Sequence, residues 1–422
     1  MPARWVPLLY FGFAHLCLAT AFLALAVTPR SLLGFYYHPR MLAVVHLVTL
    51  GWISASIQGA LYVIGPLAFR MPWPAGPADY GAFAAFAVGV VGMTGHFWMD
   101  RPRGMVWGAG LVAAAMAWVA ARGLRGLRRA PVPLEARLPM ALAFFNVIAA
   151  AGLGLALGFN KVGAFLPVAH LDVVMAHAHL AALGWAAMMV IGAGYRMLPM
   201  ILPAAMPRGA VALAASLVLE AGVAALVWSF LAGRGRLAAA SLAVLGIALF
   251  ASRVVWMLRN RRPAPAELRR PDWGTAHALQ SVACLLAAAG VGLYLAWAAP
   301  SERTLAWAPV YGVLGLIGFL SQLVVGVESR VLPLFAWLWG FADRHHAELP
   351  PPLHGASVRP LQALVFALWT AGVPLLAFGL GAERAVATSL GGAMLLAAVV
   401  ASLAHAIVVL RRLWRPQARQ AR

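Results

Sequence analysis

Residues 168–202 read VAHLDVVMAHAHLAALGWAAMMVIGAGYRMLPMIL, an almost unbroken apolar run that holds three histidines. A helix rises about 1.5 Å per residue, so this run is long enough to cross the roughly 30 Å hydrocarbon core of a bilayer. Its centre, HLAALGW at residues 179–185, closely matches HLVTLGW at residues 46–52. The run predicts a membrane-spanning helix, and the repeated phrase indicates that a histidine recurs at one position in such helices.

The composition of the whole chain supports a membrane protein. Of its 422 residues, 63% are hydrophobic and 10% are charged, whereas about a quarter of the residues of a soluble domain are charged. Apolar runs of this length are typical of transmembrane helices, and their continuity excludes the alternating strands of a membrane β-barrel. We predict twelve spans, at residues 5–27, 41–69, 81–99, 104–121, 138–159, 168–202, 209–232, 237–258, 274–298, 305–335, 360–381 and 386–410.

The net charge of +20 is distributed unevenly along the chain. Basic residues concentrate in the two tails and in the loops after the even-numbered spans, with dense clusters at 122–129 and 259–262. Positive charge marks the cytoplasmic side of a membrane protein. We therefore predict a multi-pass protein of the bacterial inner (cytoplasmic) membrane with both termini in the cytoplasm. The lipid bilayer accounts for the charge, and a nucleic-acid partner is not expected.

An internal repeat organises the chain. The phrase at 46–52, with glycine, tyrosine and proline at positions 59, 62 and 66, recurs 133 positions later, and a third copy contains Gly318, Gly326 and Pro333. The three copies fall on spans 2, 6 and 10. We predict an all-α integral membrane protein that forms one polytopic domain over residues 1–422. Internal repeats of this kind indicate three pseudo-repeated four-helix units, at approximately 1–130, 131–262 and 263–422.

Half of the twelve histidines gather toward the predicted outer leaflet, on spans 2, 3 and 6 and in the loop before span 2: His38, His46, His96, His170, His177 and His179. Ionisable groups inside a membrane are costly and are usually functional, and neutral imidazole is the commonest metal ligand. The cluster therefore predicts a metal or haem site. For any single histidine, a hydrogen bond to a neighbouring helix is the alternative.

Helix geometry separates the two histidines of the motif at 177–179. At about 100° per residue, His177 and His179 lie about 200° apart around the helix, so they point to opposite faces. They cannot bind one ion from the same face, but each can face a different cofactor. His170, seven residues before His177, shares the face of His177.

These features resemble subunit I of the heme-copper oxidases and nitric oxide reductases. That family has twelve spans, cytoplasmic termini and a pseudo-threefold arrangement, and it binds two haems through a histidine on its second span and an H-x-H motif on a later span. In this chain His46 is similar to the first element, and His177-Ala178-His179 with the glycines that follow is similar to the second. The resemblance implies that His46 and His179 clamp a b-type haem and that His177 faces a second haem or copper.

The chain departs from the family in two respects. The H-x-H motif of the family lies on span 10, whereas here it lies on span 6 and span 10 holds no histidine. The adjacent pair His345–His346 falls in a charged loop rather than in a span, so it does not resemble the family's copper site. The chain also resembles the NnrS-type membrane proteins, a twelve-span, histidine-rich group associated with nitric oxide resistance and haem and copper binding.

Three functions follow as hypotheses. The first is a haem-binding redox protein that transfers electrons or reduces oxygen or nitric oxide. If it turns over, it is an oxidoreductase. It would have an electron-donor cytochrome or partner subunit, and the sequence assigns no catalytic residue. The second is an NnrS-like haem or copper protein without turnover. The third is a metal or small-solute transporter. In the first hypothesis, a second metal site draws its ligands from four histidines: His177, His170, His96 and His38.

Other polar residues carry weaker expectations. Glu328 on span 10 is expected to pair internally with Arg330 or Arg196, with proton loading as the alternative. Basic residues at the outer ends of the spans are candidates for contacts with haem propionates, because arginine suits carboxylates, or for ordinary anchoring at the interface: Arg40, Arg101, Arg103 and Lys161.

Overall fold

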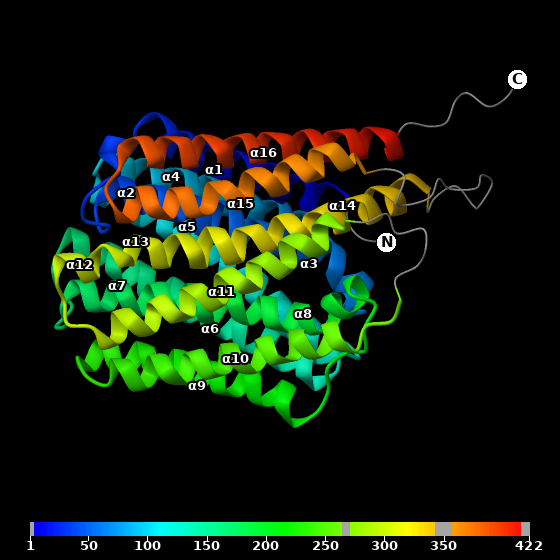
Figure 1. The fold of residues 1–422 in the computed structure, drawn as a ribbon, viewed down its shortest axis with the longest axis horizontal. Helices are drawn as coiled ribbons and strands as arrows, with labels where there is room; N and C mark the ends of the chain where they lie inside the picture. Colours follow the sequence, from blue (N-terminus) through cyan, green and yellow to red (C-terminus); the bar gives the residue numbers. More distant parts are fainter. Residues whose placement is uncertain (1–3, 264–270, 342–356, 415–422) are drawn as a thin grey trace, which may run out of the picture.

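The computed structural model describes residues 4–263, 271–341 and 357–414, and every element within these ranges is helical. Twelve helices there are long and apolar enough to cross a membrane, which confirms the predicted class and the number of spans. Figure 1 shows them side by side along the long axis of the molecule. Spans 1, 3, 4, 5, 7, 8, 9, 11 and 12 are single helices: α1 (Trp5–Val27), α4 (Pro77–Trp98), α5 (Pro102–Arg129), α6 (Leu134–Val162), α9 (Ala210–Ala232), α10 (Arg236–Arg259), α11 (Trp273–Trp297), α15 (Arg359–Gly381) and α16 (Ala385–Trp414).

The two ends of the bundle are distinguished by the chain's path. We call the end where span 1 begins and span 12 finishes the terminal end, and the opposite end, at the left of Figure 1, the distal end. The distal end carries the starts of spans 2, 6 and 10. The assignment of the terminal end to the cytoplasm stays a prediction from the charge distribution.

Spans 2, 6 and 10 differ from the others because each changes to π-helix in its middle. The π-helical segments begin directly after His46 in span 2, directly after His179 in span 6 and directly after Gly312 in span 10. A π-helical turn accommodates an extra residue and is frequent at functional sites. The elements of these spans are α2 (Pro39–His46), η2 (Leu47–Ser54), α3 (Ala55–Ala68), α7 (His170–His179), η3 (Leu180–Ala187), α8 (Met188–Ile201), α12 (Glu302–Leu305), α13 (Trp307–Gly312), η4 (Val313–Ser321) and α14 (Gln322–Phe341), with the short 3₁₀ turn η1 (Pro29–Ser31) before span 2.

The three π-helical segments lie together at the centre of the bundle. Segments η2, η3 and η4 contact one another, while α1 packs on α16, α5 on α6 and α10 on α11 around them. In each segment a glycine lies so close to the first span of its predicted unit that a Cβ atom would collide with or press on a side chain there. Small residues allow such close approach of helices in lipid. The pairs are Gly51 with Cys17, Gly184 with Asn146, and Gly318 with Cys284.

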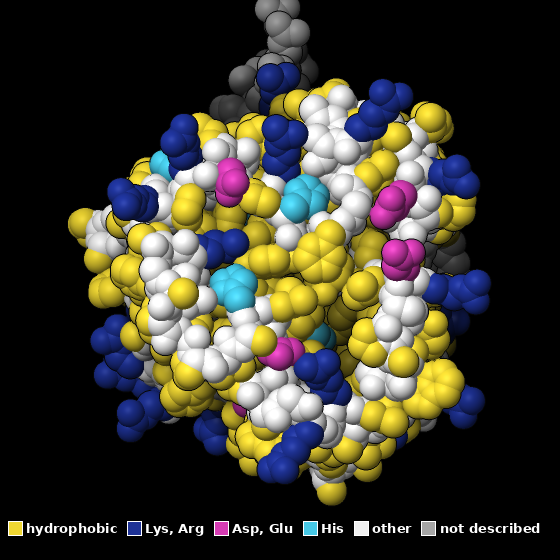
Figure 2. All heavy atoms as spheres, turned by 90° about the vertical axis from the view of Figure 1, so that its left-hand side faces the viewer, with side chains coloured by type: hydrophobic (Ala, Val, Ile, Leu, Met, Phe, Trp, Pro, Cys, Tyr) yellow, Lys and Arg dark blue, Asp and Glu magenta, His cyan; other side chains and the backbone are white. Residues whose placement is uncertain are grey.

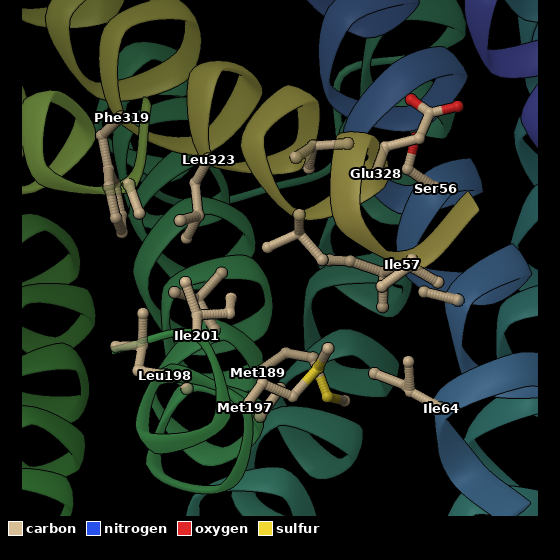
Figure 3. Close-up of a pocket in the computed structure, with 18 of the residues that line it drawn as sticks. Ser56, Ile57, Ile64, Met189, Met197, Leu198, Ile201, Phe319, Leu323 and Glu328 are labelled. Atoms are coloured by element: carbon tan, nitrogen blue, oxygen red, sulfur yellow. The ribbon is translucent and has the colours of Figure 1, made fainter. Parts of the chain in front are cut away.

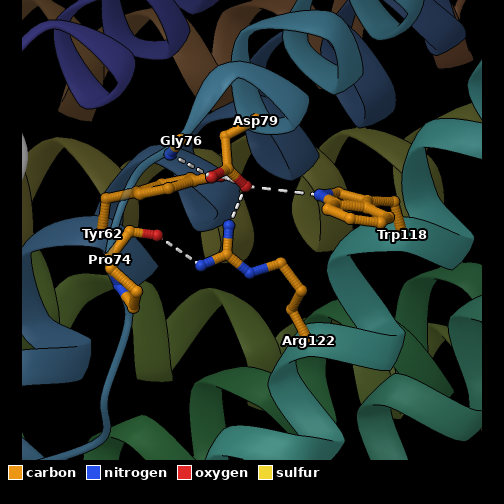
Figure 4. Close-up of polar contacts among 6 residues, drawn as sticks. All are labelled: Tyr62, Pro74, Gly76, Asp79, Trp118 and Arg122. Carbon is orange, nitrogen blue, oxygen red and sulfur yellow. Dashed lines mark hydrogen bonds and ion pairs between the residues drawn. The ribbon is translucent and has the colours of Figure 1, made fainter.

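A buried carboxylate fixes the terminal ends of spans 2, 3 and 4 (Figure 4). Asp79, at the start of α4, is 3% exposed. Its Oδ1 accepts hydrogen bonds from the Tyr62 hydroxyl at 2.9 Å and from the Trp118 indole at 3.3 Å, and it pairs with the Arg122 guanidinium. Its Oδ2 accepts the backbone N–H of Gly76 at 2.7 Å. This network joins three spans and the loop between α3 and α4.

The packing of α9 on α10 yields a prediction about stability. A Cβ atom at Gly222 would collide with the backbone of Ala243, so we expect Gly222→Val to destabilise the protein by about 1–3 kcal/mol, as overpacking does elsewhere. Thermal unfolding of the purified protein in detergent measures the effect. The matched control is Gly110→Val, because no atom lies within 4 Å of a Cβ at Gly110. Equal melting temperatures for the two variants would contradict the prediction.

Candidate functional site

The histidines predicted from the repeat lie at equivalent places in the fold. His46 is the last residue of α2 and His179 the last residue of α7, each directly before a π-helical segment. Span 10 has Gly312 at this place, at the end of α13. His177 lies on the turn before η3. His46, His177 and His179 are half-buried, so each ring retains some accessible surface although spans 2 and 6 meet at the centre of the bundle.

One nitrogen of each of these rings is bonded to a backbone carbonyl. The Nδ1 atoms lie 2.7 Å from the Leu42 oxygen for His46 and 2.8 Å from the Met175 oxygen for His179. His177 Nδ1 lies 3.0 Å from the oxygen of Ala150, on the neighbouring helix α6. A carbonyl can only accept, so Nδ1 carries the proton and Nε2 keeps its lone pair. This tautomer, with the ring held by its second nitrogen, is the one that metal-ligating histidines adopt.

His46 and His177 form one cluster, between spans 2 and 6. Both rings lie on the helical turns directly before η2 and η3, where spans 2 and 6 meet. The His46 ring stacks on Phe97 of α4 at 5.0 Å between centroids, and the His177 ring lies against Gly154 of α6, where a Cβ atom would come within 2.7 Å of it. Among the described residues, neither Nε2 atom of this pair has a hydrogen-bond partner.

His179 points instead toward spans 7 and 10. The Tyr311 hydroxyl on α13 lies 3.3 Å from His179 Nε2 and donates to it, and the two rings stack at 5.9 Å between centroids. Phe230 of α9 contacts the same ring at 5.1 Å. The expected opposite orientation of His177 and His179 agrees with these contacts. The predicted pairing of His46 with His179 stays a prediction, but these contacts favour His177 as the neighbour of His46.

The other predicted metal ligands are engaged separately. His170 uses both nitrogens, with Nε2 at 2.6 Å from the Tyr37 hydroxyl and Nδ1 at 3.0 Å from the Asn160 amide. His38 caps α2, its Nδ1 accepting the backbone N–H of Met41 at 3.4 Å. Within the described residues, no three or more His, Cys, Asp or Glu side chains gather in a way that could hold a metal ion. The structure therefore does not bring His177, His170, His96 and His38 into one metal site.

His96 does not join this cluster. His96 Nδ1 donates to the Gly92 carbonyl at 2.7 Å, and its ring packs tightly against Gly104 of α5 and beside Trp107. His345 and His346 lie outside the described residues.

The distal face presents the histidine-bearing end of the molecule. Figure 2 views this face and shows histidine side chains near its middle, beside depressions between hydrophobic side chains, with basic residues around the rim. Two of the basic candidates for haem propionates are held by aromatic rings, with the Arg40 guanidinium 5.7 Å above Trp98 and the Lys161 ammonium 4.8 Å above Tyr37. Both rim cations thus lie near the start of spans 2 and 6, where anionic groups of a ligand would be neutralised.

One residue of this region, Tyr311, was not predicted from the sequence, and the partner of Glu328 was predicted wrongly. Tyr311 could have been found from the repeat, because the third copy, 134 positions after the second, places Tyr311-Gly312 opposite His177-Ala178. The expected pairing of Glu328 with Arg330 or Arg196 is wrong, since Glu328 lies 3.7 Å from His15 of span 1. Arg330 instead pairs with Asp272, and Arg196 donates to the carbonyl of Ala68.

The fold defines a multi-pass, all-helical membrane protein with half-buried histidines on two central spans. Comparison with known proteins adds no family to this description, because no family model matches the chain and no curated protein matches it in sequence. The function is therefore argued from the residues alone.

Proposed function

We propose that the protein binds haem in the membrane through the imidazoles of spans 2 and 6 and acts as a redox protein. The observation that carries the proposal is the state of two rings: His46 and His177 each donate Nδ1–H to a carbonyl and keep an Nε2 lone pair that has no hydrogen-bond partner among the described residues. Two pre-oriented imidazoles inside an apolar bundle fit haem, whose iron binds histidine nitrogens.

The arrangement favours His46 and His177 as ligands of one cofactor. They lie on the turns before η2 and η3, where spans 2 and 6 meet, and Phe97 provides an aromatic surface beside His46. His179 belongs to a second location with Tyr311, between spans 6 and 10. When bound, haem supplies a reversible one-electron change at iron. The residues of the chain hold the ligand nitrogens in place, exclude water and, through Arg40 and Lys161, offer positive charge at the distal rim.

An absorption spectrum of the purified protein tests this function. Protein produced in haem-replete cells is reduced with dithionite, and the reduced-minus-oxidised spectrum is recorded. We expect a Soret band and visible bands of a histidine-ligated haem, in an amount stoichiometric with the protein. A colourless preparation with intact helical content and a single elution peak contradicts the proposal.

Turnover separates the redox enzyme from an NnrS-like protein that binds haem or copper without reacting. Consumption of oxygen or nitric oxide by the reduced protein, followed with an electrode, supports the enzyme, whereas a stable reduced spectrum in the presence of either gas supports binding without turnover. Metal analysis of the same sample detects copper.

A small-solute transporter is the second candidate, and a cavity favours it. Spans 2, 6 and 10 enclose a mostly apolar cavity on the terminal side of the π-helical segments, with about 120 Å³ of space for water-sized molecules. Repeated spans around a central cavity are common in transporters. Uptake of a solute by proteoliposomes that contain the haem-free protein supports this function over the first.

A further inference from the structure

A second group of polar residues lies at the mid-depth of the bundle, away from the His46–His177 cluster. His15 belongs to span 1, Ser56 to span 2 and Glu328 to span 10, and all three are buried, at 3%, 3% and 7% exposure. The His15 Nε2 and the Glu328 Oε2 atoms are 3.7 Å apart. Figure 3 shows the Ser56 hydroxyl pointing toward the side chain of Glu328, whose carboxylate lies beyond it at the edge of the central cavity.

The polar atoms that converge here are unsatisfied. Four have no hydrogen-bond partner in the described part of the chain: His15 Nε2, the Trp52 indole N–H, the Ser56 hydroxyl and Glu328 Oε2. His15 is oriented by its other nitrogen, since Nδ1 donates to the Phe11 carbonyl at 2.9 Å, and its ring lies edge-on to Trp52 at 5.1 Å. Buried polar groups that lack protein partners are usually satisfied by water, and a water needs two to four such partners.

The arginines on the helices around Glu328 have other partners, so His15 is the residue that pairs with Glu328. Arg330 of α14 pairs with Asp272 and Arg196 of α8 donates to the Ala68 carbonyl. Other titratable side chains on these spans and their neighbours include Tyr10 of α1, which stacks on Tyr62; the buried Cys17 of α1; Cys284 of α11, which lies against Gly318; His277 of α11, which packs on Phe366; and the buried His405 of α16. His15 is the titratable group with an electrostatic interaction with Glu328.

The cavity extends from this group toward the terminal end. Its walls run from Phe319, Ser56 and Glu328 near the centre to Ile64, Ile201 and Val331, which lie toward the terminal ends of spans 2, 6 and 10. Its walls are apolar apart from Ser56 and Glu328. The cavity therefore offers water a route to the carboxylate but offers few polar atoms that would hold an ion along the way.

We propose that His15 and Glu328 form an intramembrane proton-binding site, in which the two side chains share one exchangeable proton through an internal water and exchange it with the terminal end through the central cavity. The proposal rests on the unsatisfied atoms and the cavity, and it is independent of haem binding.

The chemistry of the pair balances without any other reactant. When the carboxylic acid of Glu328 gives its proton through the bridging water to the His15 Nε2 lone pair, a carboxylate and an imidazolium form, and the net charge of the pair stays zero. If the pair binds a second proton it becomes a net cation, and if it loses the first it becomes a net anion. Either net charge is costly in an apolar interior. The pair therefore holds one proton over a broad pH range and can move it between spans 1 and 10.

Infrared difference spectroscopy of the full-length protein in lipid vesicles tests the site. We expect the H₂O-minus-D₂O difference spectrum to contain one exchangeable buried carboxyl or imidazole signal that disappears in Glu328→Gln and also in His15→Phe, because the proton belongs to the pair. The matched control is Glu220→Gln. This glutamate also lies within a span, but its carboxylate accepts a hydrogen bond from Asn146 at 2.8 Å. The proposal is overturned if the two pair variants lose different signals, or if neither variant loses a signal.

A second measurement leaves His15 and Glu328 unchanged and tests whether the central cavity is the path by which the proton exchanges. Ala193 lines the cavity, so Ala193→Phe should slow the deuterium exchange of the shared signal several-fold after transfer to D₂O. The control is Ala221→Phe, on the exposed face of α9. An unchanged exchange rate in Ala193→Phe overturns the assignment of the cavity as the path. Neither experiment uses haem absorption, so failure of the haem proposal leaves both results interpretable.

Discussion

His46→Ala and His177→Ala should each abolish the haem Soret band of the purified protein, whereas His179→Ala should leave most of it in place. The reason is the geometry of span 6, where His177 keeps its Nε2 without a hydrogen-bond partner and the Nε2 of His179 is taken by Tyr311. The resemblance to heme-copper oxidases implies the opposite result, with His179 essential and His177 dispensable for the low-spin haem. The absorption spectra of the three variants therefore decide which imidazole completes the site.

The control for this series is His405→Ala. His405 is also a buried histidine within a span, at 4% exposure, and its Nε2 lacks a hydrogen-bond partner in the described part of the chain. We expect it to keep the full Soret band. The assignment to His46 fails if His46→Ala retains the band with unchanged intensity while the protein remains helical and monodisperse.

Asp79→Asn should lower the stability of the protein by about 3–5 kcal/mol, the usual effect of removing one partner from a buried ion pair. The substitution leaves the Arg122 guanidinium without its counter-ion and weakens the acceptor for Tyr62 and Trp118. Thermal unfolding in detergent measures the loss. The matched control is Asp172→Asn, because Asp172 and Arg236 are exposed by 29% and 43% in their side chains and such pairs contribute about 0–1 kcal/mol.

A double variant sharpens this test. In Asp79→Asn with Arg122→Met, no unpaired charge remains, so we expect part of the lost stability to return. If Asp79→Asn unfolds at the same temperature as Asp172→Asn, the network around Asp79 does not stabilise the ends of spans 2, 3 and 4 as described. If the double variant is no more stable than Asp79→Asn, the unpaired guanidinium is not the cause of the loss.

The fold could be predicted from the sequence because it depends mainly on length and composition. A run of about 20 apolar residues needs no knowledge of its neighbours to be recognised as a span. Most starts and ends moved by only a few residues, and the end of span 4 moved the most. Span 4 was predicted at 104–121 and extends over Pro102–Arg129, because the helix continues beyond the apolar run into the basic cluster at 122–129.

The candidate site could be predicted only in part. The repeat identified His46 and His179 as equivalent, and the 3.6-residue turn correctly placed His177 and His179 on opposite faces. Which face of span 6 meets span 2 depends on the rotation of each helix, and the π-helical turns alter that rotation in a way that a regular repeat does not reveal. The neighbour of Glu328 was missed for the same reason, since the contact of span 1 with span 10 is a property of the assembled bundle.

The π-helical segment of span 6 also bears on how the imidazoles are held before any ligand arrives. In the widened turn, the Gly184 carbonyl accepts a hydrogen bond of 3.0 Å from the side-chain amide of Asn146, which belongs to the neighbouring helix α6. The corresponding turn of span 10 is tied by the Trp369 indole, which donates to the Ile317 carbonyl at 3.3 Å. These bonds fix the rotational setting of both helices. His177 and His179 therefore belong to a preorganised frame, in which the entropy of ordering the ligands is lost during folding rather than during binding.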